Sequence, residues 1–569
     1  MEKLEIANIL EKSLRESNIN IPTKDLINLI EIPPNSEMGD FAFPCFSLAS
    51  KLKKSPQQIA QELKIKLEKI LSKSFEKIES NGPYLNFFIN RKLLAVNLIK
   101  DILTKKDSFG RLNKNNKNVM IEFPSPNTNK PLHLGHLRNM SIGESISRIC
   151  EFNGFNIIRA NLNNDKGVHI CKSMLAYKKF GKNKKPDKKT KPDHFVGDFY
   201  VMFNEKSKKN PSLEKEAQEF LKKYEAGDKE TIELWKKMNK WALDGFKETY
   251  KKFGIKLDKE YYESQIYEKG KEIIYDGLKK GLFYKTDDGA IASRLIINSV
   301  LTDKILLRAD KTSLYITQDI YLAKLKFEEF NLNSSIYVVA NEQDYHFNVL
   351  FEILEKLGIA SKQKLKHLSY GMVFLPTGKM KSREGTVVDA DDLIEEIRKL
   401  MEQELKEREK LSKKELEKRS LLIALSAIKY FLLKIESKKN MIFNPKESIN
   451  LEGDTGPYLL YSYARANSIL KKAKKSSQIS FEELEQEEIN LIKKLSLFKE
   501  IVVKSYNSLN PSLIANYSYE LSKLFNEFYS KCPVLNSEKE SFRLKLVESF
   551  KQVLKNSLYL LGIDVLERM

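Results

Sequence analysis

The chain has 569 residues, of which 41% are hydrophobic and 31% are charged. This length exceeds what a single hydrophobic core supports and predicts three or four domains, while the apolar content excludes a wholly disordered chain. The net charge of +21 favours polyanionic partners such as nucleic acids, although lysine is abundant along the whole chain and a coding bias explains the charge equally well.

The four cysteines, Cys45, Cys150, Cys171 and Cys532, lie far apart and lack metal-type spacing. We therefore expect reduced thiols in a cytoplasmic protein. The first residues are charged, and no apolar run approaches the length that spans a membrane. Neither export nor membrane insertion is indicated.

Residues 1–105 alternate between helical and turn-rich segments. Helical periodicity predicts amphipathic helices over residues 6–14 and 55–71. A turn followed by a strand is predicted over residues 82–90. We expect a small α+β domain in this region, and it contains no constellation of residues that would perform catalysis.

Residues 119–139 are the stretch around which the rest of the chain is organised. A short apolar run at residues 119–123 predicts a strand, and the proline- and asparagine-rich residues 124–131 end it. An apolar stripe with the helical period then continues to Phe152. The stretch is therefore predicted to form a strand, a loop and a helix.

Two histidines and a glycine, His133, Gly135 and His136, stand at the predicted start of this helix. Free backbone N–H groups and the positive end of the helix dipole favour an anion there, such as a nucleotide phosphate. Glycine allows a flat base or sugar to approach the backbone, and both imidazoles can donate to one polyphosphate. The alternative is two surface histidines that are adjacent by chance. By itself the pattern indicates a reaction class, nucleotidyl transfer.

The block 122–143 resembles the first signature of the class I aminoacyl-tRNA synthetases. It is similar in particular to the arginyl-tRNA synthetase form, in which Ser-Pro-Asn, here residues 125–127, and a lysine, here Lys130, precede His-x-Gly-His. The resemblance implies a Rossmann-like catalytic domain, in which Lys130 and the His-x-Gly-His residues are catalytic and the latter bind ATP. It also implies that the N-terminal domain contacts the outer corner of a tRNA.

A second strand of a βαβ unit is predicted at residues 155–161, followed by a loop at residues 162–169. Loops at the carboxyl ends of parallel strands line ligand sites in open sheets. Asp165 and His169 are therefore candidates for the rim of a site, but a capped turn explains them about as well.

Residues 178–193 are rich in lysine and predict a solvated linker. Residues 195–259 are predicted to be helical, with Trp235 and Trp241 on an apolar stripe that we interpret as core. The segment from about residue 178 to 260 resembles the insertion that class I synthetases carry beside the tRNA acceptor end.

The second half of the nucleotide fold is expected to start near Tyr261. Residues 308–319 predict a turn that runs into a strand and then a helix start, and Tyr315 and Asp319 lie one helical turn apart. A buried parallel strand is predicted at residues 335–340.

A loop at residues 341–346 and a helix at residues 347–357 follow that strand, and a last strand is predicted near residues 368–374. We therefore expect a Rossmann-like, parallel-sheet domain over residues 106–390, of fold class α/β.

The loop at residues 376–386 resembles the second class I signature, Lys-Met-Ser-Lys-Ser, which contacts the triphosphate. In the register of Lys379 and Met380 the fourth position is Ser382 instead of lysine, and Lys381 and Arg383 flank it. In arginyl enzymes the missing charge is thought to come from the lysine before His-x-Gly-His. The resemblance implies catalytic roles for Lys379, Lys381 and Arg383, and ATP contacts for residues 379–382. Which cation acts on the phosphates is left open.

Residues 391–444 are helical and highly charged, and we expect a stalk. Residues 445–569 are predicted to be all-helical and are similar to the anticodon-binding bundle of the same family. Tyr458, Tyr461 and Arg465 are the candidate tRNA contacts, because aromatic rings beside cations suit unpaired bases. For any single tyrosine, packing between helices is the alternative.

A guanidinium site needs a carboxylate, because a planar fork of donors pairs with two oxygens. Asp319 beside Tyr315 satisfies this need, and Glu122 is a second acid. Gln343 and Asn127 could hold the α-amino and carboxyl ends without adding charge. The family resemblance places six residues around the amino acid: Ser125, Asn127, His136, Tyr315, Asp319 and Gln343. The division of roles between Glu122 and Asp319 is left open.

The implied reaction activates L-arginine with ATP and Mg²⁺ and then transfers it to the terminal ribose of tRNA(Arg). ATP is a substrate in it, and we expect no tightly bound cofactor, no resident metal and a monomer. The resemblance also implies that activation needs bound tRNA. The rival functions are a class I synthetase of another specificity, a non-catalytic RNA-binding homologue and a small-molecule adenylyltransferase.

Overall fold

The computed structural model describes every residue except 1, 188, 298, 377–387, 409 and 474–482. Its contacts divide the chain into two units. The first unit contains Met1–Lys106, Ile469–Ser496 and Leu524–Gln552. The second contains Asp107–Ser468, Leu497–Lys523 and Val553–Met569. Within the described part of the chain, no helix is long and apolar enough to cross a membrane.

The N-terminal part of the first unit is an α+β layer, as expected. Its antiparallel sheet has the order β1-β3-β2, and Phe43 and Phe87 of that sheet are buried against helix residues such as Leu10 and Leu63. The elements are α1 (Glu2–Arg15), α2 (Thr23–Leu29), β1 (Phe41–Pro44), α3 (Phe46–Leu52), α4 (Pro56–Glu68), β2 (Phe75–Asn81), β3 (Tyr84–Ile89) and α5 (Arg91–Lys105).

The second unit is built on a five-stranded sheet in which every pairing is parallel, with the order β11-β10-β4-β5-β6. Because β4 and β10 are neighbours and the chain proceeds outward from each, the strand order reverses between them. Such a switch point leaves a ligand site outside the carboxyl ends of the two strands. The strands are β4 (Asn118–Glu122), β5 (Asn156–Asn163), β6 (Lys259–Tyr262), β10 (Ser334–Ala340) and β11 (Leu365–Tyr370).

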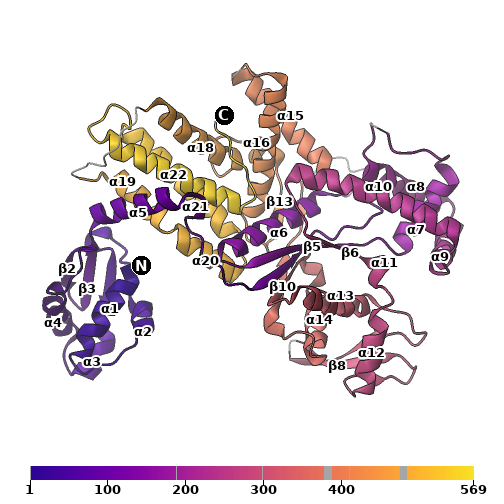
Figure 1. Cartoon of the computed structure of the whole chain (residues 1–569), viewed down its shortest axis with the longest axis horizontal. Helices are drawn as coiled ribbons and strands as arrows, with labels where there is room; N and C mark the ends of the chain where they lie inside the picture. Colours follow the sequence, from indigo (N-terminus) through magenta and orange to yellow (C-terminus); the bar gives the residue numbers. More distant parts are fainter. Residues whose placement is uncertain (1, 188, 298, 377–387, 409, 474–482) are drawn as a thin grey trace. The chain divides into compact units, whose positions relative to one another are not determined.

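Helices connect these strands and cover the sheet (Figure 1). The helix α6 (Leu134–Phe152) joins β4 to β5 and is buried on nearly all sides, with even Arg138 fully enclosed. The helices α13 (Tyr315–Phe330) and α14 (Asp344–Lys356) flank β10 in the chain. The predicted strand–loop–helix of residues 119–152 is confirmed, and so is the parallel strand at residues 335–340.

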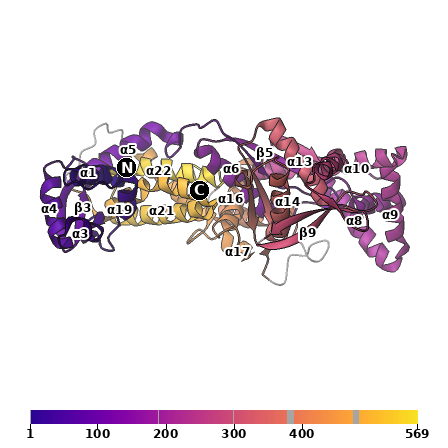
Figure 2. The ribbon, with the colours of Figure 1, turned by 90° about the horizontal axis from the view of Figure 1, so that it is seen from below.

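The helical insertion lies between β5 and β6, and its helices group together in both views (Figures 1 and 2). Trp241 packs edge-on against Tyr177 and Phe195, with ring centroids 5.7 and 5.4 Å away. Trp235 donates to the carbonyl of Asp165 at 2.7 Å. Both tryptophans pack against aromatic rings of the insertion, but each is half-buried and neither lies in the buried core that was expected for them. The helices are α7 (Val168–Phe180), α8 (Pro192–Lys209), α9 (Ser212–Glu225) and α10 (Lys229–Phe253).

The segment between β6 and α13 differs from the prediction. It forms a three-stranded antiparallel sheet of β7 (Tyr284–Lys285), β8 (Ile291–Ile297) and β9 (Val300–Leu307) that the sequence reading did not include. The strand predicted within residues 308–319 is absent. Lys311, with φ of 65°, turns the chain back, and Thr317 caps α13 by accepting from the Leu314 N–H. Two short helices, α11 (Glu263–Ile266) and α12 (Gly270–Lys279), precede this sheet.

The helices α15 (Ala390–Arg408) and α16 (Lys413–Leu433) do not form a separate stalk, because both pack on α6. Nor is the predicted strand at residues 368–374 continuous. At Gly371 the chain leaves β11, and the Arg138 guanidinium donates to the Gly371 and Ser437 carbonyls at 2.7 and 3.0 Å. A parallel pair, β12 (Val373–Phe374) and β13 (Met441–Ile442), follows.

The remaining elements are all helical, as expected for the C-terminal region. They are α17 (Pro445–Ser448), α18 (Gly456–Lys472), α19 (Gln486–Ser496), α20 (Phe498–Ser508), α21 (Ser512–Lys531) and α22 (Glu540–Leu560).

Candidate active site at the carboxyl ends of the parallel strands

The loop after β4 is held to the loop after β5 by hydrogen bonds. The Ser125 N–H donates to Oδ1 of Asn161 at 3.0 Å, and Ser125 has a φ of 54°. Asn164 donates its side-chain amide to the Ser125 carbonyl at 3.1 Å. These contacts leave Asn127 exposed at the strand ends. The first part of the predicted site is thus a loop fixed on both sides.

His133 and His136 form a reciprocal cap at the start of α6. Nδ1 of His133 accepts from the Gly135 N–H at 3.1 Å, and Nδ1 of His136 accepts from the His133 N–H at 3.1 Å. A neutral imidazole that accepts at Nδ1 carries its proton on Nε2. Each ring therefore has its remaining donor on Nε2.

Burial, together with the charge of Lys130, lowers the pKa of His133 to about 4. Burial lowers the pKa of His136 well below its usual value, and the neighbouring His133 and Lys130 add to this effect. Both rings are consequently neutral near pH 7. Lys130 itself is half-buried, with its ammonium 4.9 Å from the centre of the Tyr200 ring.

The expectation of free backbone donors at this helix start is wrong. The Leu134 N–H donates to the Val388 carbonyl at 2.8 Å, and the His136 N–H donates to the His133 carbonyl at 2.7 Å. With Gly135 donating to His133, the first N–H groups all have partners within the chain. An anion at this position would therefore meet imidazole N–H groups and a lysine instead of the backbone.

Asp319 lies on the second turn of α13, and Nε2 of His346 lies 2.6 Å from its Oδ2. The helix α13 leads into β10, whose amino end lies at the opposite edge of the sheet from the ligand site. The start of α13 therefore lies at the carboxyl edge, and Asp319 lies near it. Tyr315, one turn earlier, is 73% exposed. Gln343 is also exposed and ends the turn after β10. Sequence reasoning did not assign His346, which stands in the loop predicted after β10.

Glu122 ends β4 and forms an ion pair with Lys326 of α13. Lys326 is fully buried and Glu122 nearly so. Burial works to lower the pKa of Lys326, but the Glu122 carboxylate outweighs it and raises this pKa, with a further contribution from Asp319. Lys326 is therefore charged, and the Glu122 carboxylate already has a cationic partner within the chain.

Asp165 does not cap its own turn as the alternative interpretation expected; it contacts the start of α11, 99 residues further along the chain. Its carboxylate accepts from the N–H and the hydroxyl of Ser264 at 2.9 and 2.7 Å. His169 lies 3.2 Å from the Tyr200 hydroxyl, on the insertion.

No contact among the described residues links the other predicted site residues to the carboxyl edge of the sheet. Lys379, Met380, Lys381, Ser382 and Arg383 lie outside the described residues. Tyr458, Tyr461 and Arg465 lie along α18, where the Arg465 guanidinium stacks 4.6 Å from the centre of the Tyr461 ring.

In the described part of the chain, one group of metal-ligating side chains lies close together. Ligand atoms of Asp193, His194 and Asp391 are within 4.8 Å of one another. The Lys191 ammonium, however, lies 3.0 Å from Asp193 and 2.8 Å from Asp391. A positive charge thus already bridges the two carboxylates, and we interpret the group as an ion-pair network.

Known families match along almost the whole chain. Residues 98–445 match the family described as tRNA synthetases class I (R), catalytic domain. The chain belongs to the arginyl-tRNA synthetases. The Arginyl tRNA synthetase N terminal domain matches residues 4–89, and the DALR anticodon binding domain matches residues 459–569.

Individual relatives agree with this assignment. The chain is 48% identical over 561 residues to an arginine–tRNA ligase from Treponema denticola, covering 95% of this chain and 94% of the relative. It is 44% identical over 589 residues to the arginine–tRNA ligase of Borrelia duttonii, covering 100% and 99%. Its structure is similar to that of Thermus thermophilus arginyl-tRNA synthetase, with a TM-score of 0.81, 25% identity and full coverage of both chains.

Proposed function

We propose that the carboxyl ends of β4 and β10 form the site at which this arginine–tRNA ligase performs both of its steps. In the first step the arginine carboxylate attacks the α-phosphorus of ATP, and pyrophosphate leaves. In the second step the terminal ribose hydroxyl of tRNA(Arg) attacks the adenylate, and AMP leaves. No side chain forms a covalent intermediate, so catalysis rests on positioning and on charge stabilisation.

The ATP would lie against His133 and His136. Two neutral rings that each present Nε2–H can donate to phosphate oxygens without a prior change of protonation. Lys130, whose charge already affects His133, would supply a cation near the leaving pyrophosphate. Gly135 allows close approach, and Mg²⁺ would neutralise the remaining phosphate charge together with Lys379, Lys381 and Arg383. Met380 and Ser382 would contact the nucleotide.

The guanidinium would pair with Asp319. Its carboxylate is partly exposed, and its Oδ2 lies 2.6 Å from Nε2 of His346, whereas the Glu122 carboxylate is paired with the buried Lys326. We therefore assign guanidinium recognition to Asp319 and treat Glu122 as the second acid. His346 would orient the Asp319 carboxylate, and Tyr315 would cover the guanidinium plane. Asn127, Ser125 and Gln343 would hold the ammonium and carboxylate ends.

The tRNA would extend from this site to the C-terminal helices. We assign residues 445–569, with Tyr458, Tyr461 and Arg465, to anticodon binding, and residues 1–105 to the outer corner of the tRNA. Residues 106–390 would form the catalytic domain, and residues 391–444 would connect it to the anticodon-binding helices. We further propose that the enzyme is a cytoplasmic monomer.

The observation that carries the proposal is the adjacency of β4 and β10, with Tyr337 paired to Glu122. It brings the loop of the first signature beside the turn that holds Gln343, although about two hundred residues separate them in the chain. The test is ATP–pyrophosphate exchange, which we expect only when L-arginine and tRNA(Arg) are both present. Exchange with lysine or cysteine but none with arginine would refute the specificity.

A further inference from the structure

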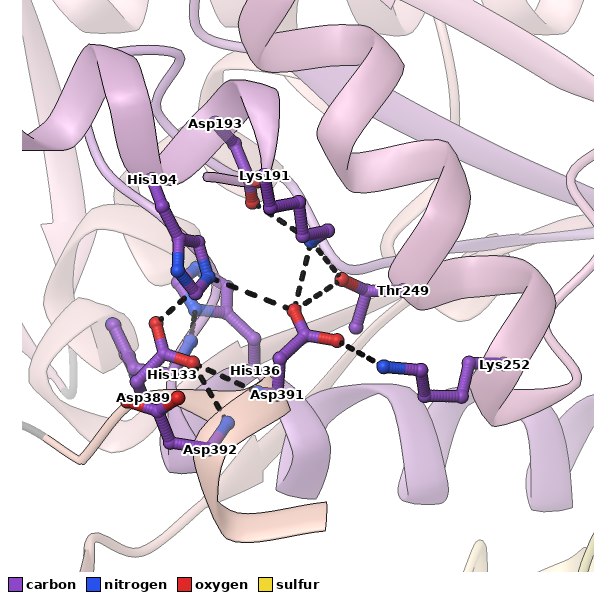
Figure 3. A network of polar contacts seen from close by, with 10 residues as sticks. All are labelled: His133, His136, Lys191, Asp193, His194, Thr249, Lys252, Asp389, Asp391 and Asp392. Carbon is purple, nitrogen blue, oxygen red and sulfur yellow. Dashed lines mark hydrogen bonds and ion pairs between the residues drawn. The ribbon is translucent and has the colours of Figure 1, made fainter. Parts of the chain in front are cut away.

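A network of charged side chains surrounds Asp391, at the start of α15 (Figure 3). Its Oδ2 accepts from Lys191 and Thr249, both at 2.8 Å, and its Oδ1 accepts from Lys252 at 3.0 Å. Lys191 precedes α8, whereas Thr249 and Lys252 lie on α10. One carboxylate therefore holds two helices of the insertion.

The same network reaches Asp389, two residues earlier. Nε2 of His194, on α8, lies 3.2 Å from Oδ2 of Asp389 and 3.8 Å from Oδ2 of Asp391. Oδ1 of Asp389 accepts from the N–H groups of Asp391 and Asp392 at 2.9 and 3.0 Å, so it caps α15. Figure 3 shows the His194 ring between the two carboxylates.

The backbone of this segment is paired with the start of α6. Asp389 forms an antiparallel bridge with His133. The Leu134 N–H donates to the Val388 carbonyl at 2.8 Å, and the Ala390 N–H donates to the Leu132 carbonyl at 3.0 Å. The segment 388–391 is therefore held by the insertion on one side and by the main chain of the His-x-Gly-His on the other.

Charged groups of both signs face one another in the network, and burial raises the pKa of Asp193 and of Asp389. Three carboxylates, Asp193, Asp389 and Asp391, face two lysines and His194. Burial works to raise the pKa of Asp391, but His194, Lys191 and Lys252 outweigh it and hold this pKa well below its usual range. Burial works to lower the pKa of His194, and the adjacent carboxylates reverse this and raise it. Because most of these groups are buried, removing one leaves a charge that water cannot screen.

We propose that Asp391, with Lys191 and His194, is a positioning residue for arginine activation, which fixes His133 and His136 relative to the helical insertion. The inference rests on the proposed function, in which those histidines contact ATP. Asp391 does not touch the reacting atoms; it acts through the bridge between Asp389 and His133. A displacement of the two imidazoles by about an ångström lowers the rate without altering the arginine site.

The test compares Asp391→Asn, Lys191→Met and their double variant in ATP–pyrophosphate exchange with arginine and tRNA(Arg). Each single variant should melt at a lower temperature and lose at least about tenfold in kcat, with the KM for arginine within about twofold of wild type. The double variant removes one charge of each sign, so its melting temperature should recover while its kcat stays low.

A matched control is Asp244→Asn, which removes an exposed ion pair with Lys240 on the same helix, α10. It should leave the melting temperature and kcat unchanged. If the buried variants do not fold, Thr249→Val removes the hydroxyl that donates to Asp391 and accepts from Lys191, without changing a charge, and should lower kcat by a few-fold.

Recovery of wild-type kcat in the double variant, or an unchanged kcat in folded Asp391→Asn or Thr249→Val, would overturn the positioning role and leave a stabilising one. These outcomes require a wild-type enzyme that exchanges with arginine and tRNA(Arg). Absence of that exchange would instead refute the proposed function.

Discussion

Replacing Asp319 with asparagine tests the assignment of the guanidinium site. Oδ2 of Asp319 lies 2.6 Å from His346, so one oxygen is shared and the other is available. The guanidinium would then gain one to two charge-assisted hydrogen bonds, each contributing about 1.5–3 kcal/mol. Asparagine keeps the shape but loses the charge, so we expect a loss of about 2–5 kcal/mol. This corresponds to a roughly 30- to 5,000-fold rise in the KM for arginine.

The same substitution should hardly affect folding. The Asp319 side chain is 27% exposed, and a polar contact at a partly exposed site contributes about 0–1 kcal/mol to stability. The matched control is Asp344→Asn, which removes an exposed acid at the start of α14 that lies 3.2 Å from His367 of β11. Aminoacylation at varied arginine concentration measures KM, and thermal melting measures stability. A wild-type KM in folded Asp319→Asn would refute the assignment.

Three further predictions follow from the same site. The pKa of His133 in the folded protein is about 4, below the ordinary 6.5, so its contribution to stability is present above pH 6.5 and is lost as the pH falls toward 4. Histidine NMR should show His133 and His136 titrating well below pH 6.5. A titration near pH 6.5 would contradict their burial. Lys326→Met should lower the free energy of unfolding by about 3–5 kcal/mol in denaturant, because it leaves the Glu122 charge buried without a partner. Adding Glu122→Gln to this variant should recover much of the loss. An equal loss in the single and the double variant would contradict a stabilising ion pair between the two residues. Lys130→Met should raise the KM for ATP in pyrophosphate exchange and raise the pKa of His133, and an unchanged KM would argue that another cation acts on the phosphates.

Two inner strands of the parallel sheet, β4 and β10, were predictable because they are continuous apolar runs that stop at polar turns. The runs at residues 119–123 and 335–340 are too short for helices and are bounded by turn residues, and both form strands of the sheet. The start of α6 was predictable for a similar reason, since a proline-rich loop precedes a long helical period.

The small sheet of β7, β8 and β9 could not be found in the same way. Ile296, Val300 and Leu301 are exposed apolar residues near its hairpin, so the alternation of apolar and polar residues that marks a half-buried strand is blurred there. The charged residues of α15 and α16 are conspicuous in the sequence, and they indicate a solvated stalk. Both helices pack on α6, which is far away in the chain, and the number of charged residues does not predict such a contact.

Much of the candidate site was also predictable as a set of residues, but its pairings were not. Ser125, Asn127 and Gln343 follow strands in the sequence, which places them at one edge of a parallel sheet. The pairing of His346 with Asp319, and that of Lys326 with Glu122, join positions that are 27 and 204 residues apart. The residues near Glu122 and Asp319 in the sequence do not indicate which of the two carboxylates pairs with a lysine and which with a histidine. The occupied N–H groups of α6 depend likewise on residue 388, far along the chain.

The most direct test of the account is a structure of the enzyme with a non-hydrolysable arginyl-adenylate analogue. We expect guanidinium nitrogens within about 3 Å of the Asp319 carboxylate, and the adenylate beside Nε2 of His133 and His136. A guanidinium paired with another acid, or an adenylate remote from the two histidines, would contradict the claim that one edge of the sheet binds both substrates.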